Sequence, residues 1–462
     1  MDRAGMQELS ASMPLAEAVL EVFQYIGNAA RLQAIFDENR GQCYDGKITF
    51  PSLVSLVGDA LLEHEGSANQ SFSRAQETGE LKASKVAAYR KLGRLAVPLS
   101  QAFHRDLSHS LRELFPEQAH RRPPESLREF STIILDGKAI KNVAKRLKIL
   151  RKVGGGLLGG RVLAAIQYET GLTVAMHADE DGDANDVRFV PELLPVIRQE
   201  IAGPLLFMAD SGFCDLQRME EFTEGGNHFL VRRHPKVGFH PDSQRPKQSG
   251  TDAQGRPFFE EWGWLGATNH PKRRYVRQIT LKRPGESDVQ IVTDLLEADK
   301  YPAKDLLSHY LQRWGIEQVF QKITEVFHLK ALIGSTPKAT IFQFAFCLLL
   351  YNMTQLIRGY VAAHQKRDSE TISIENLFLD AHRQLSAWSV LVEAGLPLDD
   401  IRIAPDLTVM ATRLHALLAN QWSNRWIKAT NKKRRAHVAK PRDRTHGSVY
   451  RILNPHILEI GK

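Results

Sequence analysis

The spacing of apolar side chains changes along the chain and divides it into helix-forming and strand-forming parts. Residues 14–118 repeat apolar positions every three or four residues, for example Leu15, Val19 and Val22. This spacing is typical of amphipathic helices. The stretch 120–126 then combines basic side chains with paired prolines and predicts a boundary.

Beyond that boundary the apolar runs become short and rich in β-branched residues. The run Ser131–Asp136 shows no alternation, which is typical of a strand buried on both faces. The order is strand, hairpin, helix, strand, helix, strand, which predicts a mixed sheet with helices on its faces. The corresponding ranges are 131–136, a hairpin of 162–168 and 172–177, a helix at 187–200 that Asn185 and Asp186 could cap, 205–210, 216–223 and 228–232.

The second half of the chain predicts a β-rich insertion followed by helices. Residues 235–298 contain Gly, Pro and Ser clusters between short β-like runs, which predicts strands joined by turns. The most apolar run, 342–353, is too short to cross a bilayer and predicts a buried helix rather than a membrane segment. The helices are expected at 303–326, 338–364, 374–395 and 407–427.

Composition limits the possible partners and compartment. The 462 residues carry a formal net charge of +8 and a pI of about 9.2, which favours a polyanion such as nucleic acid as partner. The cysteines Cys43, Cys214 and Cys347 are far apart, so neither a zinc site nor a disulfide framework is expected. We expect a reducing cytoplasmic location, and the N-terminus does not have the pattern of a signal peptide.

Three acidic residues are the candidate catalytic and metal-binding groups. Asp136 and Asp210 each end a predicted buried strand, and Glu317 lies on the helix expected at 303–326. Tyr310 and Arg313 precede Glu317 at a spacing that places all three on one helical face. Converging carboxylates can hold two divalent ions for phosphodiester chemistry, and hard oxygen ligands suit Mg²⁺ or Mn²⁺.

Each of these residues also has a purely structural interpretation. Asp136 and Asp210 are followed by glycine-bearing turns, so they could be turn formers or helix caps. Arg313 could form an ion pair with Glu317 at i+4, while Tyr310 packs in the core.

The three acidic segments together resemble the DDE transposases of bacterial insertion sequences, in the subgroup with a Tyr-x2-Arg-x3-Glu-x6-Lys signature. The matching segments are 135–138 (Leu-Asp-Gly-Lys), 208–213 (Met-Ala-Asp-Ser-Gly-Phe) and 310–317 (Tyr-Leu-Gln-Arg-Trp-Gly-Ile-Glu), supported by 40–44 and 226–232. The resemblance implies a ribonuclease-H-like α/β core: a mixed sheet with helices on both faces, interrupted by a β-rich insertion. It also implies that Asp136, Asp210 and Glu317 bind two Mg²⁺ or Mn²⁺ ions, and that Arg313 and Tyr310 bind phosphate.

Five regions follow from the pattern and the resemblance together. The order is a helical, DNA-binding N-terminal region, the first part of the core, the insertion, the catalytic helix, and a helical C-terminal region with a basic tail. The expected boundaries are 1–120, 128–234, 235–298, 299–335 and 336–462.

The signature lysine is missing. Its position, seven residues after Glu317, holds Thr324. In the family this lysine contacts phosphate near the transposon end, so its absence puts DNA-end affinity in question. Lys322 or Lys330 could take over this DNA contact, and Lys322 is a DNA-binding candidate for that reason, but only if the helix distorts.

Further DNA contacts are expected from basic and aromatic segments. Residues 138–152 hold Lys138, Lys141, Lys145 and Arg146 without any acid, which predicts a mobile loop on the DNA backbone or a solvated helix. Trp262 and Trp264 could stack an extruded base, or pack in a β core. The basic tail at 425–444 could track phosphates or remain solvated.

The sequence therefore predicts a DNA transposase that cleaves element ends and joins them to target DNA. The expected partners are double-stranded DNA and a second copy of the chain, because two ends must be paired. Two alternatives remain open: a catalytically impaired DNA-binding relative, which Thr324 favours, and a related nuclease without strand transfer. In the cell we expect a cytoplasmic protein, associated with the nucleoid when it is bound to DNA.

Overall fold

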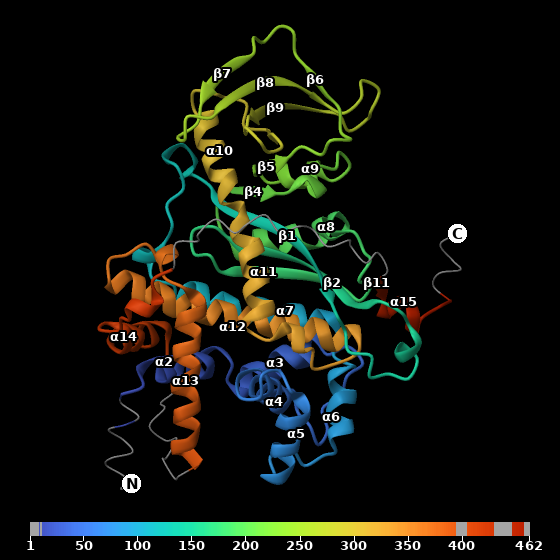
Figure 1. The fold of residues 1–462 in the computed structure, drawn as a ribbon, viewed down its shortest axis with the longest axis vertical. Helices are drawn as coiled ribbons and strands as arrows, with labels where there is room; N and C mark the ends of the chain where they lie inside the picture. The colour runs from blue at the N-terminus through green and yellow to red at the C-terminus, as the bar shows by residue number, and fades with distance from the viewer. Residues whose placement is uncertain (1–8, 10–11, 394–403, 429–445, 457–462) are drawn as a thin grey trace.

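A mixed β-sheet forms the centre of the molecule, with helices packed against it. The computed structural model describes Leu9 and residues 12–393, 404–428 and 446–456. In Figure 1 the strands of the insertion lie at one end and most of the N- and C-terminal helices at the other. The segment α10–α11 runs along the front between these two ends.

The core strands follow the order β3-β2-β1-β4-β5. β1 pairs antiparallel with β2 and parallel with β4, and β4 pairs parallel with β5. β2 and β3 form the predicted hairpin. This order, with only β2 reversed among the five, is the ribonuclease-H-like arrangement and confirms the predicted fold class. The strands are β1 Ser131–Lys141, β2 Gly156–Gln167, β3 Thr173–Asp179, β4 Leu205–Ala209 and β5 His228–Arg232.

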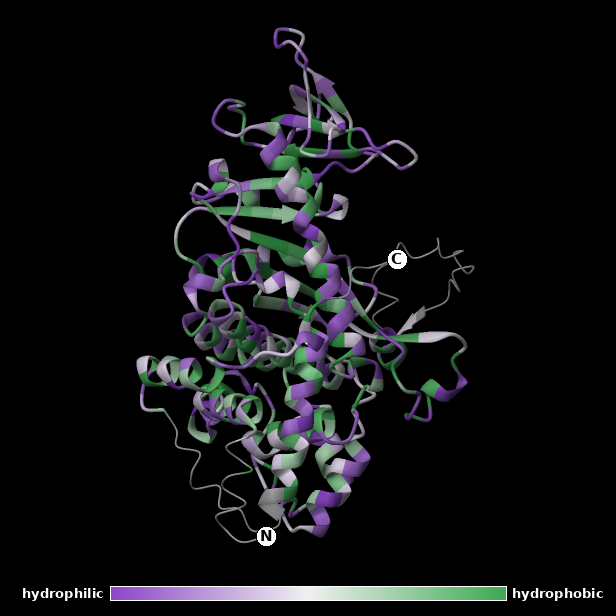
Figure 2. Cartoon of the chain, turned by 60° about the vertical axis from the view of Figure 1, so that its left-hand side comes forward, coloured by the Kyte–Doolittle hydropathy of each residue, from purple (hydrophilic) through white to green (hydrophobic). Residues whose placement is uncertain are grey.

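The two faces of this sheet have separate apolar cores. Alternate residues of one strand point to opposite faces, so Ile134 joins the larger core while Ile133 and Leu135 join the smaller one. α8 (Val190–Glu200) and α9 (Met219–Thr223) cover the smaller core, and α7, α11 and α12 cover the larger. Figure 2 shows the hydrophobic colour concentrated along the core strands and the hydrophilic colour in the outer loops.

The insertion extends the same sheet. β10 pairs antiparallel with β5, and the sheet then continues through β9 and β8 to β6, while β7 also pairs with β8. The prediction of a β-rich insertion is thus met, with two short strands that the sequence pattern did not indicate. The strands are β6 Phe239–Pro241, β7 Gln248–Thr251, β8 Pro257–Leu265, β9 Arg274–Leu281 and β10 Val289–Thr293.

Of the N-terminal helices, α7, α2 and α6 pack against the long helix α12 (Pro337–His364). α12 is long and apolar enough to cross a membrane, yet its most apolar window is entirely buried within the protein. It therefore serves as the core helix that the sequence predicted. The N-terminal helices are α2 Pro14–Ile26, α3 Ala29–Asn39, α4 Phe50–Leu62, α5 Ala68–Glu77, α6 Lys85–Leu92 and α7 Val97–Glu113.

The remaining C-terminal elements agree only in part with the sequence pattern. α13 (Ile374–Glu393) matches its prediction, but α14 (Leu407–Leu418) ends well before residue 427. A short strand β11 (His446–Ser448) joins the sheet beside β2, and α15 (Val449–Leu453) follows it. Most of the predicted basic tail lies outside the described residues.

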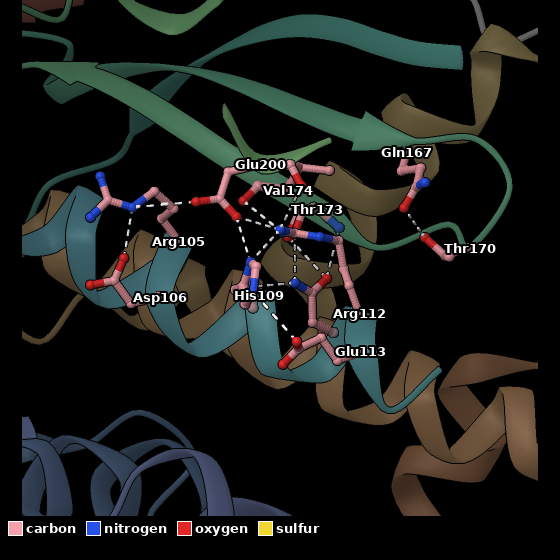
Figure 3. A network of polar contacts seen from close by, with 12 residues as sticks. Arg105, Asp106, His109, Arg112, Glu113, Gln167, Thr170, Thr173, Val174 and Glu200 are labelled. Atoms are coloured by element: carbon pink, nitrogen blue, oxygen red, sulfur yellow. Dashed lines mark hydrogen bonds and ion pairs between the residues drawn. The ribbon is translucent and has the colours of Figure 1, made fainter. Parts of the chain in front are cut away.

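A charged network attaches α7 to the sheet (Figure 3). Glu200, at the end of α8, accepts hydrogen bonds from Arg112 and from His109 Nδ1, the latter at 2.9 Å. Arg112 also donates to the carbonyl of Val174 in β3. The side chains of Arg112 and Glu200 are only 8% and 15% exposed, so each leaves a buried charge if the other is removed.

We expect Glu200→Ala to lower the free energy of unfolding by about 3 kcal/mol, because it leaves the buried guanidinium of Arg112 without its anionic partner. Urea denaturation followed by circular dichroism measures this change. The matched control is Glu113→Ala, whose carboxylate is half exposed and 3.7 Å from His109; its effect should stay below about 1 kcal/mol. Equal effects in the two variants would contradict the structural role of Glu200.

Candidate active site

Asp136 and Asp210 lie side by side at the sheet centre. β1 and β4 are parallel neighbours, and their last paired residues are Leu135 and Ala209. Asp136 and Asp210 come directly after this pair, so the strand spacing places their backbones about 5 Å apart. The sequence prediction that both aspartates emerge near each other from buried strands agrees with this geometry.

Both carboxylates face the helical segment α10–α11. Asp136 has the same direction as Ile134 two residues before it, and Asp210 the same direction as Met208. Ile134 and Met208 belong to the larger core, to which α11 also contributes. The segment consists of α10 (Ala303–Leu311), a 3₁₀ turn (Gln312–Trp314) and α11 (Gly315–Glu325).

The local bonding of the two aspartates leaves one oxygen of each available. Asp136 Oδ1 accepts from its neighbour Gly137 N at 3.0 Å, and Asp210 Oδ1 accepts from Gly212 N at 2.8 Å. Their second oxygens accept no hydrogen bond from the described residues. Burial and then the charge of Asp210 raise the pKa of Asp136 to about 7, against the opposing effect of Arg313. A cation beside this pair would relieve both causes.

The catalytic segment is broken, which corrects the expectation of one continuous helix over 303–326. The 3₁₀ turn at 312–314 interrupts it between Tyr310 and Glu317. In a 3₁₀ turn residues i and i+3 nearly eclipse, and the Arg313 guanidinium carbon lies 6.0 Å from the centre of the Tyr310 ring. Arg313, in this turn, is buried, and the charges of Asp136 and Asp210 act on it.

Arg313 is the central group of the site. It is 7% exposed, and the charges of Asp136, Asp210 and Glu317 all act on it. Its Nη2 donates to Glu317 Oε1 at 3.3 Å, whereas its buried Nε and Nη1 have no hydrogen-bond partner among the described residues. Buried donors without a partner are costly, so a ligand with acceptor oxygens would stabilise this arrangement.

Glu317 is the most accessible of the three acids, with a side chain 44% exposed. The ion pair with Arg313 that the sequence offered as the structural alternative is present, so the three carboxylates gather around this guanidinium. Within the described part of the chain, no group of three or more His, Cys, Asp or Glu side chains is arranged to hold a metal ion. The free oxygens of Asp136 and Asp210 fit a hard divalent ion, and Glu317 would complete the set by leaving Arg313.

Tyr310 is a structural anchor in this conformation. It is 5% exposed, and its hydroxyl donates to the carbonyl of Ala209 at 3.3 Å. The adjacent His309 shares a 2.8 Å hydrogen bond with the hydroxyl of Thr132 in β1. Neighbouring residues of α10 therefore bind to both strands that carry the aspartates. A role of Tyr310 in phosphate binding stays a prediction.

Lys138 is a cation that lies against α11, the helix on which the signature lysine is missing. It follows Asp136 on the same face of β1, and its Nζ lies 5.8 Å from the centre of the Phe320 ring on α11. Burial and Lys141 lower its pKa, while Asp136 and Glu317 raise it. Lys138 thus faces the acidic site.

The other candidates on α11 face elsewhere. Lys322 Nζ is 2.8 Å from Glu375 and forms an ion pair with it, while Thr324 donates its hydroxyl back to the carbonyl of Phe320 at 2.7 Å. In this conformation neither side chain supplies a free cation to the site.

The basic segment 138–152 begins as a strand, is irregular over residues 142–149 and ends in a 3₁₀ turn, so the loop considered from the sequence is only part of it and the solvated helix is wrong. Residues 138–141 complete β1, and Lys141 is exposed at its end. Lys145 Nζ donates to the carbonyl of Val153, and Arg146 donates to the carbonyls of Leu332 and Ile333. These two side chains hold the segment to the fold.

The two tryptophans of the insertion differ in exposure. Trp262 is 4% exposed and donates its indole N–H to the carbonyl of Leu296 at 2.9 Å, which is the packed arrangement considered from the sequence. Trp264 is 39% exposed and has the Arg273 guanidinium 4.0 Å from its ring centre. Only Trp264 presents a ring at the surface.

An ion pair that the sequence did not single out, between Arg161 and Asp186, lies next to the strand segment that carries Asp136. Arg161 in β2 binds both carboxylate oxygens of Asp186, and a Cβ on Gly137 would lie 2.0 Å from the Asp186 carboxyl carbon. Gly137 thus allows Asp186 to approach the strand immediately after Asp136. No sequence signal links these residues, because the contact spans three separate segments; Asp186 itself suggested only a helix cap.

We expect Gly137→Ala to displace Asp186 and to lower the free energy of unfolding by about 1–3 kcal/mol through overpacking. The shift of β1 at this residue should also slow DNA cleavage by about 10- to 100-fold, because it moves Asp136. Thermal unfolding and a cleavage time course measure both effects. A Cβ on Gly154 would meet nothing within 4 Å, so Gly154→Ala is the matched control and should change neither quantity.

The site therefore places two carboxylates side by side on adjacent parallel strands of a ribonuclease-H-like sheet, Asp136 within β1 and Asp210 directly after β4, with a third acid on a covering helix. Residues 129–353 match the family model described as the transposase DDE domain. This match confirms the resemblance seen in the sequence for this part of the chain. The matched range contains Asp136, Asp210 and Glu317.

The other comparisons are less informative. No curated protein matches the chain. Among solved structures, the chain is similar to the cryo-EM structure of a piggyBac transposase synaptic complex with hairpin DNA. The identity is 10%, the TM-score is 0.40, and the match covers 84% of this chain and 85% of that one.

Proposed function

We propose that this protein cleaves DNA at the ends of a mobile element and joins those ends to target DNA. Cleavage would transfer a phosphoryl group to water and release a 3′-hydroxyl. Joining would let that hydroxyl attack a target phosphorus and displace the target's own 3′ oxygen. The observation that carries this proposal is the paired aspartates, Asp136 and Asp210, facing the buried guanidinium of Arg313 and the accessible Glu317.

The carboxylates are the proposed ligands of two Mg²⁺ or Mn²⁺ ions. When bound, such ions activate the attacking oxygen and stabilise the leaving one. Asp136 offers a free oxygen from within β1 and Asp210 from the end of β4, and these rigid strands favour a fixed geometry. The accessible position of Glu317, 44% exposed, would let this residue exchange its ion pair with Arg313 for a role as ligand.

Arg313 and Lys138 are the proposed phosphate contacts. The unpartnered Nε and Nη1 of Arg313 form part of the planar fork that matches phosphate oxygens. Lys138 lies on the same strand face as Asp136, and the charges of Asp136 and Glu317 both act to raise its pKa. Together they would hold the scissile phosphate against the carboxylates without the signature lysine.

A second candidate function is a DNA-binding relative with impaired catalysis. Thr324 favours it, because its hydroxyl is bound to its own helix and carries no charge. A nuclease that cuts without joining remains the other alternative. In every case double-stranded DNA is the proposed partner, and pairing of two ends would require a homodimer.

The test is cleavage of duplex DNA carrying the element ends and their flanks, with purified protein in Mg²⁺ and in EDTA. Metal-dependent cutting followed by a joined product supports the transposase. Cutting without any joined product would leave only the nuclease. DNA binding with no cutting in Mg²⁺ or Mn²⁺ would reject the enzyme and leave the impaired relative.

A further inference from the structure

A large groove lies beside the catalytic segment, on the flank next to the end of α12. It has a volume of about 880 Å³. We call it the flanking groove and define it by Arg122, Gln312, Gly315, Gln318, Lys366 and Arg367, which all line it. These residues come from the linker before β1, from the catalytic segment and from the end of α12, so only the fold brings them together.

Three cations of the flanking groove are available to a ligand. Arg122, Lys366 and Arg367 are exposed, and none of them forms an ion pair with a described residue. Arg367 rests on the ring of Trp422 at 4.5 Å, a contact with the guanidinium face that leaves its N–H groups free to donate.

The acidic residues that line the groove, Glu370 and Asp368, already accept hydrogen bonds from other groups of the protein. Glu370 accepts from Arg121, from Arg358 at 2.7 Å and from Lys428 at 3.1 Å. Nearby cations, Arg358 and Arg121 foremost, outweigh burial and lower the pKa of Glu370, so it stays ionised and paired. Asp368 Oδ1 accepts the backbone N–H of Glu370. The groove therefore presents a net positive rim.

The floor of the groove is open enough for the backbone of a bound ligand to approach closely. A Cβ on Gly315 would meet nothing within 4 Å, so the glycine leaves open space there. Gln312 and Gln318 lie one turn before and after it, and their amides form no hydrogen bond with the described residues. Gln318 directly follows Glu317, about 100° around the helix, so the groove begins next to the candidate active site.

We propose that the flanking groove binds the phosphodiester backbone of duplex DNA next to the segment held in the active site. Free cations and amide donors on a shallow polar floor are the groups that proteins use on DNA phosphates. This inference rests on the proposed function, because it gives the groove the same DNA molecule. The contacts are to phosphate alone, so they position the duplex without reading its sequence.

The experiment measures binding of a 40-base-pair duplex of arbitrary sequence in EDTA, from about 50 to 200 mM salt. Each phosphate contact contributes about −0.9 to the slope of log K against log salt, so Arg122→Gln/Lys366→Gln/Arg367→Gln should make the slope shallower by 2–3. The matched control, Lys272→Gln/Lys282→Gln/Lys300→Gln, removes the same charge from lysines that already form ion pairs. It should retain the wild-type slope.

A second variant tests the groove without changing its charge. Gly315 has ordinary right-handed helical geometry, so Gly315→Gln fits the backbone and fills the open floor. We expect duplex binding to weaken roughly tenfold, because the side chain occupies the space of the DNA backbone. Circular dichroism of each variant establishes that it is folded.

The outcomes separate this inference from the proposed function. A shallower slope only in the groove variant, with weaker binding by Gly315→Gln, supports the groove. An unchanged slope in the groove variant, an equal loss in the control, or wild-type affinity of Gly315→Gln overturns it. Metal-dependent cleavage by the wild-type protein is measured separately. If the groove does not bind DNA, cleavage can still support the proposed enzyme. If the protein does not cleave, groove-dependent DNA binding can still be observed.

Discussion

Replacement of Asp136 by asparagine should reduce DNA cleavage by about 10³-fold or more, because it removes a charge that a divalent ion requires. The same change should stabilise the metal-free protein at pH 8. Asparagine has nearly the shape of the protonated acid, but it never carries the charge that burial and Asp210 oppose. Loss of activity with a gain in stability is expected where a site holds like charges for function.

The pH dependence of stability gives the sign of this effect. The pKa of Asp136 is about 7 in the folded protein and about 3.9 in an unfolded chain. Between these values the unfolded chain releases the proton while the folded protein keeps it, so the free energy of unfolding falls as pH rises. Three pKa units set an upper limit of about 4 kcal/mol, lost between about pH 4 and pH 7 and constant above.

Denaturant unfolding in EDTA at pH 5 and pH 8 measures this difference. The gap between Asp136→Asn and the wild-type protein should be larger at pH 8 than at pH 5, and Mg²⁺ should narrow it by stabilising the wild-type protein alone. The control is Asp288→Asn, because Asp288 lies in the insertion beside Lys282 and has a lowered pKa. Wild-type cleavage by Asp136→Asn, or parallel stability curves, would contradict the role of Asp136.

Local sequence patterns were sufficient for the core strands and for placing the acids on them or directly after them. The apolar runs before Asp136 and Asp210 specify buried strands, and the hairpin at residues 169–171 follows from local turn chemistry. These features depend on neighbours in the sequence, so periodicity detects them. The parallel pairing of β1 with β4 then brings the two aspartates together.

The rest of the site depends on contacts between distant segments. The 3₁₀ break before Glu317 comes directly after Leu311, the residue that follows Tyr310. The Tyr310 hydroxyl donates to the carbonyl of Ala209 in β4, which is 101 residues away in sequence. In the sequence, Lys145 and Arg146 are candidate DNA contacts. In the fold, both side chains donate hydrogen bonds to backbone carbonyls. The flanking groove joins three segments whose individual sequences give no sign of it.

Arg313 should be needed both for the rate of cleavage and for its pH dependence. Its guanidinium lies among the three carboxylates and opposes the rise in the pKa of Asp136. We expect Arg313→Met to slow single-turnover cleavage by roughly 10²- to 10³-fold, as for loss of one preorganised donor to a reacting group. The remaining activity should need a higher pH, because Asp136 would hold its proton more tightly.

Cleavage of prebound duplex from pH 6 to pH 9 separates this role from simple packing. Arg313→Lys keeps the charge but loses the planar fork, so it should retain the wild-type pH midpoint while remaining slow. Lys322→Met is the control: it removes a cation from the same helix, but that cation is paired with Glu375, and neither rate nor midpoint should change. A slow Arg313→Met with an unshifted midpoint would mean that Arg313 acts on the phosphate or the fold alone, and that Asp136 titrates independently of it.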